Sequence, residues 1–439
     1  MEDRGIMEQL TQVPAHQRVL GALVSKDRNT MLLAMATALE QHSQRLFAAN
    51  RKDIAAADQA DLATPLRKRL VFDEKKLASV CDGVRQVASL RDPIGRIRER
   101  RLLDDQLLLE RVDVPIGVIG MVFESRPDAL VQIISLCLKS GNAIILKGGH
   151  EALNTNRELV AVIRESLQPF VAGSGWIVHL ESREDVKSLL ELDDIVDLLI
   201  PRGSNEFVRY IMDNTKIPVL GHADGICALY VDAEAPIDLA VTVAVDSKCQ
   251  YPAVCNAVET VLVHSAVAAT FLPRFKEALA PWSVIIHGDP RVGAIIDCRE
   301  AVEDDWDTEY LGYEVAIRVV DSLQEAMDHI AAHGSGHTDC IVTSHEANAR
   351  KFMREVDSAD VFWNCSTRFA DGFRYGLGAE VGVSTQKIHA RGPVGLDGLV
   401  IGKWLLSGNG HIVDTYEKGR AFKHEELSLA GVGLLGEIE

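Results

Sequence analysis

Cys255 has the setting of a thiol that can reach a substrate. It stands in the segment YPAVCNAVETVLVH (251–264). Pro252 is expected to end a helix that runs through 239–248, and a strand is expected from about residue 259, so Cys255 falls on the loop between them. A thiol on such a loop can act as a nucleophile once it is ionised. The alternative is that Cys255 is one more small buried apolar residue, as most cysteines are.

The remaining cysteines carry weaker signals. Cys137 and Cys340 lie in apolar helix and strand patterns and are expected to be buried. Cys249 precedes Cys255 by six residues, so a regulatory disulfide between them is conceivable, but the eight cysteines follow no paired spacing. We therefore expect free thiols, a reducing compartment and a cytoplasmic protein.

Two strand ends have the composition of an anion-binding loop. Lys147-Gly148-Gly149-His150 follows AIIL, and Pro201-Arg202-Gly203-Ser204 follows VDLLI. Each joins glycine and a basic residue to the start of a helix, where free backbone N–H groups attract phosphate. A purely structural role remains the alternative for either loop alone. The letters G-x-G-x-x-G at 431–436 leave no room for the helix that a dinucleotide motif requires.

No metal site is expected. His333 and His337 have the i, i+4 spacing of a helical metal pair, but Gly334 and Gly336 argue against a helix there. The chain also contains no G-x-S-x-G motif, which argues against the serine hydrolases that use it.

The elements around these residues alternate between strand and helix, which predicts parallel crossovers and ligands at the carboxyl ends of the strands. After a buried strand that ends at Phe123, we expect helices at 127–139, 151–167, 183–192 and 205–214 and strands at 143–147, 176–180 and 196–201. A second α/β unit is expected from residue 226, with strands near 228–231, 259–264, 315–320 and 340–343. Helices are expected over 15–58 and 64–90, and a β-hairpin arm between 102 and the buried strand.

Composition narrows the function classes. Of 439 residues, 46 are Lys or Arg and 64 are Asp or Glu, so the formal charge is −18 and nonspecific binding to nucleic acid is not expected. The opening MEDRGIMEQL lacks the pattern of a signal peptide, and the apolar stretch 114–123 is half the length of a membrane span. We expect neither a nucleic-acid nor a membrane partner.

Six ordered blocks of the chain closely resemble the γ-glutamyl phosphate reductases, also called glutamate-5-semialdehyde dehydrogenases, of the aldehyde dehydrogenase superfamily. The blocks are VPIGVIGMVFESRP (114–127), LCLKSGNAIILKGGHEA (136–152), HADGICALYVD (222–232), YPAVCNAVETVLVH (251–264), GSGHTDCIVT (334–343) and STRFADGFRYGLGAEVGVSTQKIHARGPVGL (366–396). The resemblance implies an aldehyde-dehydrogenase-like α/β fold, with two doubly wound parallel domains and a small β-hairpin oligomerisation arm. The implied parts are an NADP-binding domain (1–100 and 121–225), a catalytic domain (226–370), and a hairpin with C-terminal tail (101–120 and 371–439).

The resemblance also implies a reaction. γ-Glutamyl phosphate is reduced with NADPH to glutamate-5-semialdehyde, with release of phosphate, in the second step of proline biosynthesis. Cys255 matches the nucleophile that forms a thioester. The backbone N–H of Cys255, the side chain of Ser125 and the neighbouring Asn256 are the other implied catalytic groups, since charge develops on the carbonyl oxygen.

Cofactor and substrate residues follow from the same resemblance. Lys147, Gly149 and His150 are implied near the adenosine ribose and its 2′-phosphate, Gly203 and Ser204 near the pyrophosphate, and Glu309 near the nicotinamide ribose. No carboxylate follows Lys147 directly, which favours NADP over NAD. Arg126, Arg368 and Arg391 are candidates for the substrate carboxylate and phosphate, because guanidinium binds both in a bidentate manner. Surface ion pairing is an equal alternative for Arg391.

Departures from related sequences sharpen the prediction. Hydrolytic aldehyde dehydrogenases carry Glu-Leu-Gly-Gly where this chain has His222-Ala-Asp-Gly225, so the base that would hydrolyse a thioester is missing; His222 could equally cap a turn. Many reductases of this family have Thr and Arg where this chain has Cys249 and Tyr251, which bears on substrate affinity. No kinase domain is fused to the reductase, so a separate glutamate 5-kinase must supply the acyl phosphate. Direct contact between the two enzymes is one way to transfer it. The competing functions are oxidation of an aldehyde to an acid and a noncatalytic scaffold for the kinase.

Overall fold

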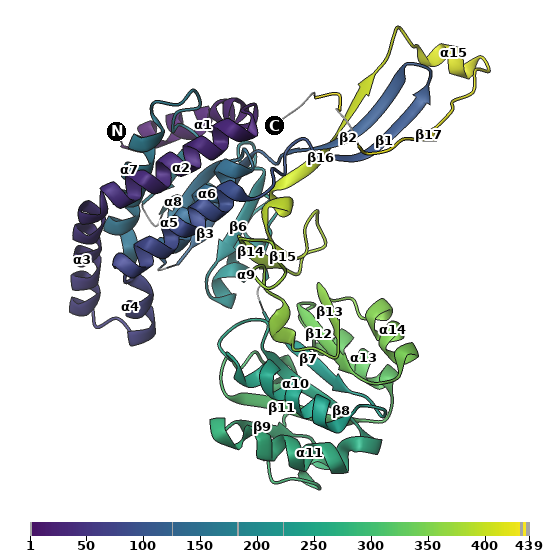
Figure 1. Ribbon diagram of the computed structural model, residues 1–439. Helices are drawn as coiled ribbons and strands as arrows, with labels where there is room; N and C mark the ends of the chain where they lie inside the picture. The colour runs from purple at the N-terminus through teal and green to yellow at the C-terminus, as the bar shows by residue number, and fades with distance from the viewer. Residues whose placement is uncertain (1, 125, 182–183, 223, 431–432, 436–439) are drawn as a thin grey trace.

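The computed structural model describes residues 2–124, 126–181, 184–222, 224–430 and 433–435. Figure 1 shows two α/β lobes joined by a narrow region, with a long β arm that projects away from both. None of the helices in these ranges has the length and apolar character needed to cross a bilayer.

The first lobe is built on a four-stranded parallel sheet in the order β5-β4-β3-β6. Its strands and helices are α1 (Glu2–Gly21), α2 (Ser25–Gln41), α3 (Ser43–Gln59), α4 (Thr64–Leu70), α5 (Glu74–Ser89), β3 (Val118–Phe123), α6 (Pro127–Lys139), β4 (Ala143–Gly148), η1 (His150–Ala152), α7 (Leu153–Leu167), β5 (Ile177–Leu180), α8 (Glu184–Leu190), β6 (Leu198–Arg202) and α9 (Asn205–Asp213). All six residues of β3 and of β4 are buried, because helices cover both faces of the sheet. The predicted alternation is confirmed, although the helical stretch expected over 15–58 is broken into three helices.

The second lobe has a seven-stranded parallel sheet in the order β10-β9-β11-β8-β7-β12-β13. Its elements are β7 (Cys227–Val231), α10 (Ile237–Cys249), β8 (Val258–His264), α11 (Ser265–Leu279), η2 (Ala280–Trp282), β9 (Ile285–Gly288), α12 (Pro290–Gly293), β10 (Arg299–Glu300), η3 (Glu303–Asp307), β11 (Glu314–Val320), α13 (Leu323–His333), β12 (Thr338–Val342), α14 (Glu346–Glu355) and β13 (Asp360–Trp363). The four predicted strands are present at the sheet centre. Strands β9, β10 and β13, at or next to the edges of the sheet, were missed, because they are short and partly or fully exposed.

The arm is an antiparallel sheet in the order β16-β2-β1-β17. Its elements are β1 (Ile97–Asp104), β2 (Leu107–Pro115), β16 (Val400–Ser407), α15 (Val413–Glu417) and β17 (Glu425–Glu426). The hairpin thus occupies 97–115 rather than 101–120, and residues 118–120 belong to the buried strand β3 of the first lobe. A turn at Pro115–Gly117, where Gly117 has a φ of +138°, separates the arm from that strand.

A C-terminal segment returns from the second lobe to the first before it enters the arm. It contains η4 (Thr367–Phe369), the two-stranded sheet β14 (Gly382–Ser384) and β15 (Gly392–Val394), and η5 (Leu396–Leu399). Val381, Val394 and Leu399 join the apolar core of the first lobe. Part of the stretch assigned to the arm and tail therefore belongs to the first lobe, since these apolar side chains are buried in its core.

Candidate active site

The candidate site lies at the junction of the two lobes, where the ends of strands from both sheets face each other. From the first lobe come the carboxyl ends of β3 and β6, and from the second lobe the amino ends of β7, β8 and β12. Gly225, Cys255 and His337 each stand one to three residues before one of these three strands. Because β7, β8 and β12 are neighbours in one parallel sheet, the loops that precede them are brought together.

Cys255 lies on a tight loop between α10 and β8. The helix ends at Cys249, before Pro252, and β8 begins at Val258, which confirms the loop predicted for Cys255. The Cys227 Sγ donates to the Cys255 carbonyl oxygen at 3.1 Å. Gly225 packs directly against this loop: a Cβ on Gly225 would lie 2.4 Å from that oxygen and 2.5 Å from the Cys255 Cα. Only glycine permits this approach, so Gly225 helps to fix the nucleophile's backbone.

The thiol of Cys255 is partly exposed and electrostatically restrained. Burial, together with the carboxylates of Glu309 and Glu380, raises its pKa to about 12, and Arg202 opposes them. At neutral pH the sulfur is therefore the thiol. A nucleophilic role requires that the thiol lose its proton when the substrate binds.

Two imidazoles flank the sulfur. One nitrogen each of His222 and His337 and the Sγ of Cys255 all lie within 4.8 Å of one another, and the two rings meet edge to face with centroids 5.0 Å apart. His222 is held through Nδ1 by the carbonyl of Val383 at 2.9 Å. Burial lowers the pKa of both histidines, that of His337 to about 3, so both rings are neutral at physiological pH.

Of the other two implied catalytic residues, Asn256 and Ser125, the structure describes only Asn256. Asn256 is buried, and its Nδ2 donates to the carbonyl of Ala370 at 2.7 Å, which ties the nucleophile loop to the C-terminal segment. Its Oδ1 has no hydrogen-bond partner among the described residues. Ser125 lies outside the described residues.

Two arginines lie at this junction, and one of them is within electrostatic reach of the thiol. Arg202 at the end of β6 lies within electrostatic reach of Cys255, Glu380 and Arg126, and its guanidinium is 3.5 Å from the Glu380 carboxylate. Arg126 is exposed and forms a loose 3.7 Å pair with Asp128. An anion that enters between the lobes can thus contact Arg126 directly, whereas Arg202 is shared with Glu380.

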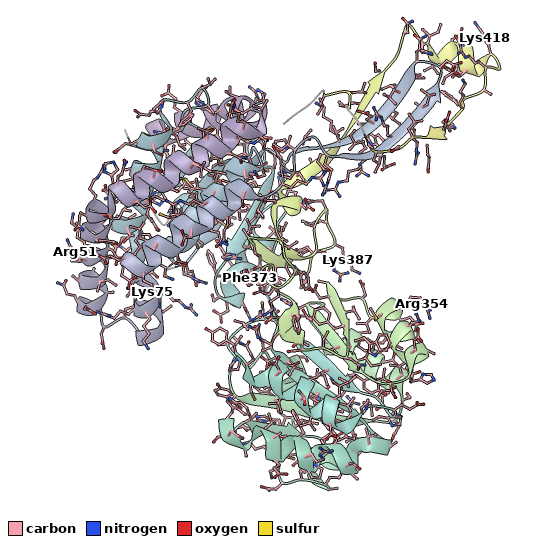
Figure 2. All side chains as sticks on the ribbon, viewed as in Figure 1. Arg51, Lys75, Arg354, Phe373, Lys387 and Lys418 are labelled. Carbon is pink, nitrogen blue, oxygen red and sulfur yellow. The ribbon has the colours of Figure 1, made fainter. Side chains whose placement is uncertain are left out.

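Arg368 and Arg391, the other two candidates, have different surroundings. Arg368 is buried, its Nε donates to Gln250 at 2.9 Å, and it lies within electrostatic reach of Cys255. Arg391 donates to the Asp357 carboxylate at 2.8 Å and to its carbonyl at 2.9 Å. Lys387, labelled in Figure 2, pairs with the same carboxylate, so these two cations fasten the C-terminal segment to the second lobe. The structure therefore brings Arg368 near the thiol and engages Arg391 in an ion pair.

An exposed aromatic ring stands at the same junction. Figure 2 shows Phe373 between the two lobes, and 81% of its surface is exposed. Its backbone is held by Asp371, which accepts from the Phe373 and Arg374 N–H groups. The ring is thus presented on a fixed turn close to Ala370, the partner of Asn256.

The first group of cofactor candidates lies at the end of β4. Lys147 is buried and donates to the Gly148 carbonyl at 2.7 Å, Gly149 is half-buried, and His150 is exposed at the start of η1. Asp53 of α3 accepts from the backbone of Asn154 and Thr155 and so anchors the start of α7 beside this loop.

The second group lies at the end of β6. Gly203 and Ser204 are exposed, and Ser204 precedes α9 without a side-chain cap. The neighbouring Asn205 donates to the Glu309 carboxylate of the second lobe at 2.5 Å, which places Glu309 next to these residues. Strand β3 separates β4 from β6, so the two loops are about 10 Å apart at a strand spacing of about 4.8 Å. Exposed backbone at two such strand ends fits an extended ligand with several phosphates.

Sequence reasoning missed four residues of this site. Arg202 was noted only as part of a phosphate loop, and Gly225, Glu380 and His337 were not assigned to the nucleophile. The segment HADG at 222–225 contains two neighbours of the thiol, His222 and Gly225, and could have indicated both.

The two positions at which the chain departs from many related reductases differ in exposure. Tyr251 is exposed and Cys249 is buried. All eight cysteines are free thiols.

A separate polar groove lies at the base of the arm. Arg98, Arg111, Asp113, His389 and Arg391 are among its lining residues. It contains neither Cys255 nor the glycines at the ends of β4 and β6, so it is distinct from the site described above.

Comparisons with known proteins identify the family of the chain. The model of the aldehyde dehydrogenase family matches residues 13–304. The chain is 54% identical to the γ-glutamyl phosphate reductase of Ruminiclostridium cellulolyticum, over 93% of this chain and 95% of that protein, and 51% identical to that of Acetivibrio thermocellus, over 96% and 98%. The crystal structure of γ-glutamyl phosphate reductase from Thermotoga maritima matches with a TM-score of 0.91 and 37% identity, covering 93% of this chain and 99% of that one. An acetylating aldehyde dehydrogenase from Geobacillus thermoglucosidasius, at 16% identity and a TM-score of 0.63, shares the fold. The resemblance and the fold class inferred from sequence are confirmed: the chain belongs to the γ-glutamyl phosphate reductases of the aldehyde dehydrogenase family, oxidoreductases that act on an aldehyde group with a nicotinamide cofactor.

Proposed function

We propose that the protein reduces γ-glutamyl phosphate to glutamate-5-semialdehyde with NADPH and releases inorganic phosphate, the second step of proline biosynthesis from glutamate. The observation that carries this proposal is the position of Cys255, a free thiol at the lobe junction with Arg202 and Arg368 within electrostatic reach. Arg126 lies beside Arg202. A substrate with a carboxylate and an acyl phosphate needs cations of this kind next to the nucleophile.

In the first step the Cys255 sulfur attacks the acyl carbon. The S–C bond forms, the proton leaves the thiol, and the C–O bond to phosphate breaks, so that a thioester remains. The thiol pKa of about 12 makes loss of this proton the costly part of the step. The incoming phosphate draws Arg202 and Arg126 toward the sulfur, and their charge favours the thiolate.

Negative charge then collects on the carbonyl oxygen. The Cys255 backbone N–H and the second Nδ2 hydrogen of Asn256 are donors on the correct loop, and we assign Ser125 the same task. Loss of one such donor typically lowers the rate by about 10²- to 10³-fold.

When bound, NADPH would supply the hydride that reduces the thioester, and the C–S bond would then break to release the aldehyde and return the Cys255 thiol. Lys147, Gly149 and His150 are proposed to hold the adenosine ribose and its 2′-phosphate, Gly203 and Ser204 the pyrophosphate, and Glu309 the nicotinamide ribose. The Glu181 carboxylate, which feels the charge of Lys147, is also paired with Arg157 at 3.0 Å.

Reduction of the thioester is favoured over its hydrolysis, because a neutral histidine, His222, occupies the position at which hydrolytic relatives have the glutamate base. Glu309 and Glu380 are close enough to affect the thiol, but Glu309 accepts from Asn205, and Glu380 accepts from the Gly372 N–H and faces Arg202. Because both carboxylates are engaged in these contacts, we assign neither of them the role of a base that activates water.

Further parts of the proposal concern partners. The apolar side chains exposed on the arm support a homo-oligomer, the free thiols support a cytoplasmic location, and the labile acyl phosphate must come from a separate glutamate 5-kinase.

The test measures oxidation of glutamate-5-semialdehyde in the reverse direction. Activity is expected to require both NADP and phosphate and to be lost in Cys255→Ala. The matched control is Cys365→Ala, which removes another partly exposed thiol of the same lobe and should leave activity intact. No activity in the parent chain, which would favour a scaffold, or phosphate-independent oxidation to the acid, which would favour a hydrolytic aldehyde dehydrogenase, would refute the proposal.

A further inference from the structure

The thiol of Cys255 and the imidazoles of His222 and His337 lie together in the site, although the proposed reduction uses only the thiol. Cys255 precedes β8, His337 precedes β12, and His222 lies in the segment that leads into β7. The three side chains offer one sulfur and two nitrogen atoms within 4.8 Å of one another. They come from positions 222, 255 and 337, so their convergence is a product of the fold and not of a local motif.

His337 gives an independent sign that this group is built for a ligand. The residue has no exposed surface, and its Nε2 has no hydrogen-bond partner among the described residues. A buried polar atom left without a partner is costly, on the order of 1–3 kcal/mol. Its Nδ1 contacts the Thr338 hydroxyl at 2.7 Å, so Nε2 is the nitrogen that remains free to bind.

His222 is oriented in the same way. Its Nδ1 contacts the Val383 carbonyl at 2.9 Å, which assigns the proton to Nδ1 and leaves the Nε2 lone pair for a ligand. A backbone carbonyl or hydroxyl that fixes the far nitrogen is the usual arrangement around a metal-binding histidine.

We propose that His222, Cys255 and His337 form a Cys-His₂ site that binds one Zn²⁺ reversibly and thereby blocks the nucleophile. One thiolate and two imidazoles are ligands that Zn²⁺ prefers, at about 2.3 Å for sulfur and about 2.0–2.1 Å for nitrogen. The three atoms lie within 4.8 Å of one another, close enough for one ion to contact all three after small side-chain adjustments. In this step the thiol loses its proton to solvent, an S–Zn bond forms, and the two imidazole nitrogens donate lone pairs; nothing is oxidised or reduced.

The proposed site is suited to reversible binding of Zn²⁺ rather than to a permanently bound structural ion. The described residues supply three ligands and no fourth, and three protein ligands with an open position differ from the closed four-ligand sites of structural zinc. A bound Zn²⁺ would occupy the sulfur that must attack the substrate. Metal and substrate therefore compete for Cys255.

The proposal is tested by metal binding without substrate. The full chain is freed of metal with a chelator and titrated with Zn²⁺ against a chromophoric competitor. We expect one equivalent per chain. Co²⁺ in place of Zn²⁺ should give a sulfur-to-cobalt charge-transfer band that is absent in Cys255→Ser.

Variants identify the ligands. His222→Gln, His337→Gln and Cys255→Ser should each weaken Zn²⁺ binding by at least about tenfold, the range seen when even supporting groups of a metal site are removed. His389→Gln and Cys365→Ser are the matched controls and should bind as the parent does. Since His337 is buried, circular dichroism and thermal melting check its variant, and the partly exposed His222 decides the matter if that variant does not fold.

The outcomes separate this proposal from the proposed function. Zn²⁺ should also slow alkylation of Cys255 by iodoacetamide, and a chelator should restore the rate. Absence of a bound equivalent, or unchanged affinity in the His222 and His337 variants, would overturn the zinc site. Neither reading depends on turnover of glutamate-5-semialdehyde, so the reductase assignment can fail or stand independently.

Discussion

Replacement of Gly225 by alanine should displace the nucleophile while leaving every reactive group in the chain. The added Cβ would lie 2.4 Å from the Cys255 carbonyl oxygen, 2.5 Å from its Cα and 2.6 Å from its Cβ. Ordinary contact begins at 3.4 Å, so the two backbones must separate by about 1 Å. The φ of Gly225 is not in the left-handed region, so the steric clash is the whole effect.

The size of the loss follows from that displacement. A misplacement of about 1 Å costs about 10²-fold in rate, which corresponds to about 2.7 kcal/mol in the barrier. Overpacking of the buried contact should also lower the free energy of unfolding by about 1–3 kcal/mol.

The assay is NADP- and phosphate-dependent oxidation of glutamate-5-semialdehyde, with urea unfolding as the second measurement. Gly83→Ala is the matched control, since Gly83 lies inside helix α5 and nothing stands within 4 Å of its added Cβ. That variant should keep its kcat/KM and gain about 0.5–1 kcal/mol of stability. Parental kcat/KM and stability in Gly225→Ala would refute the reasoning, because the loops would then not be in contact as described.

Three further changes test the electrostatics, the core and the arm. Alkylation of Cys255 by iodoacetamide should speed up about tenfold per pH unit from pH 7 to 10, because the thiolate fraction grows that way below a pKa of about 12. Glu380→Gln should raise the rate at each of these pH values by removing a charge that raises the pKa; a slower rate would contradict the assigned sign. Lys248→Met leaves the carboxylate of Glu259 buried without its cation and should lower the free energy of unfolding by about 3–5 kcal/mol in urea titration, whereas joint replacement of both residues by apolar ones should recover most of it. Trp404→Glu on β16 places a charge on the exposed apolar face of the arm and should lower the molar mass measured by light scattering; an unchanged mass would show that this face is not the interface.

Local patterns were enough to predict much of the fold. Strands such as β3 and β4 are continuous apolar runs between helices, and the proline after α10 correctly predicted a loop for Cys255. These features depend on neighbours along the chain, which periodicity reports directly.

The rest of the site depends on contacts between distant segments. His337 was judged only against His333, four residues away, although its partners are His222 and Cys255. Arg202 faces Glu380, 178 positions further along. Such pairs leave no local spacing in the sequence, and the resemblance that predicted Cys255 did not name them. Whether Arg391 binds substrate remains a proposal, although its ion pair with Asp357 favours a structural role.

The arm also makes assembly depend on the progress of translation. Strand β2 forms early in the chain, but its partner β16 pairs with it from Val400 opposite Pro115 to Ser407 opposite Leu108, nearly 300 residues later. On the ribosome, the β1–β2 hairpin must wait with both edges unpaired while both lobes are synthesised, because β1 finds its partner β17 only at Glu425–Glu426, and such edges invite misassociation. Chains that stall before Glu426 would carry a folded first lobe whose arm still exposes a strand edge that the complete chain covers.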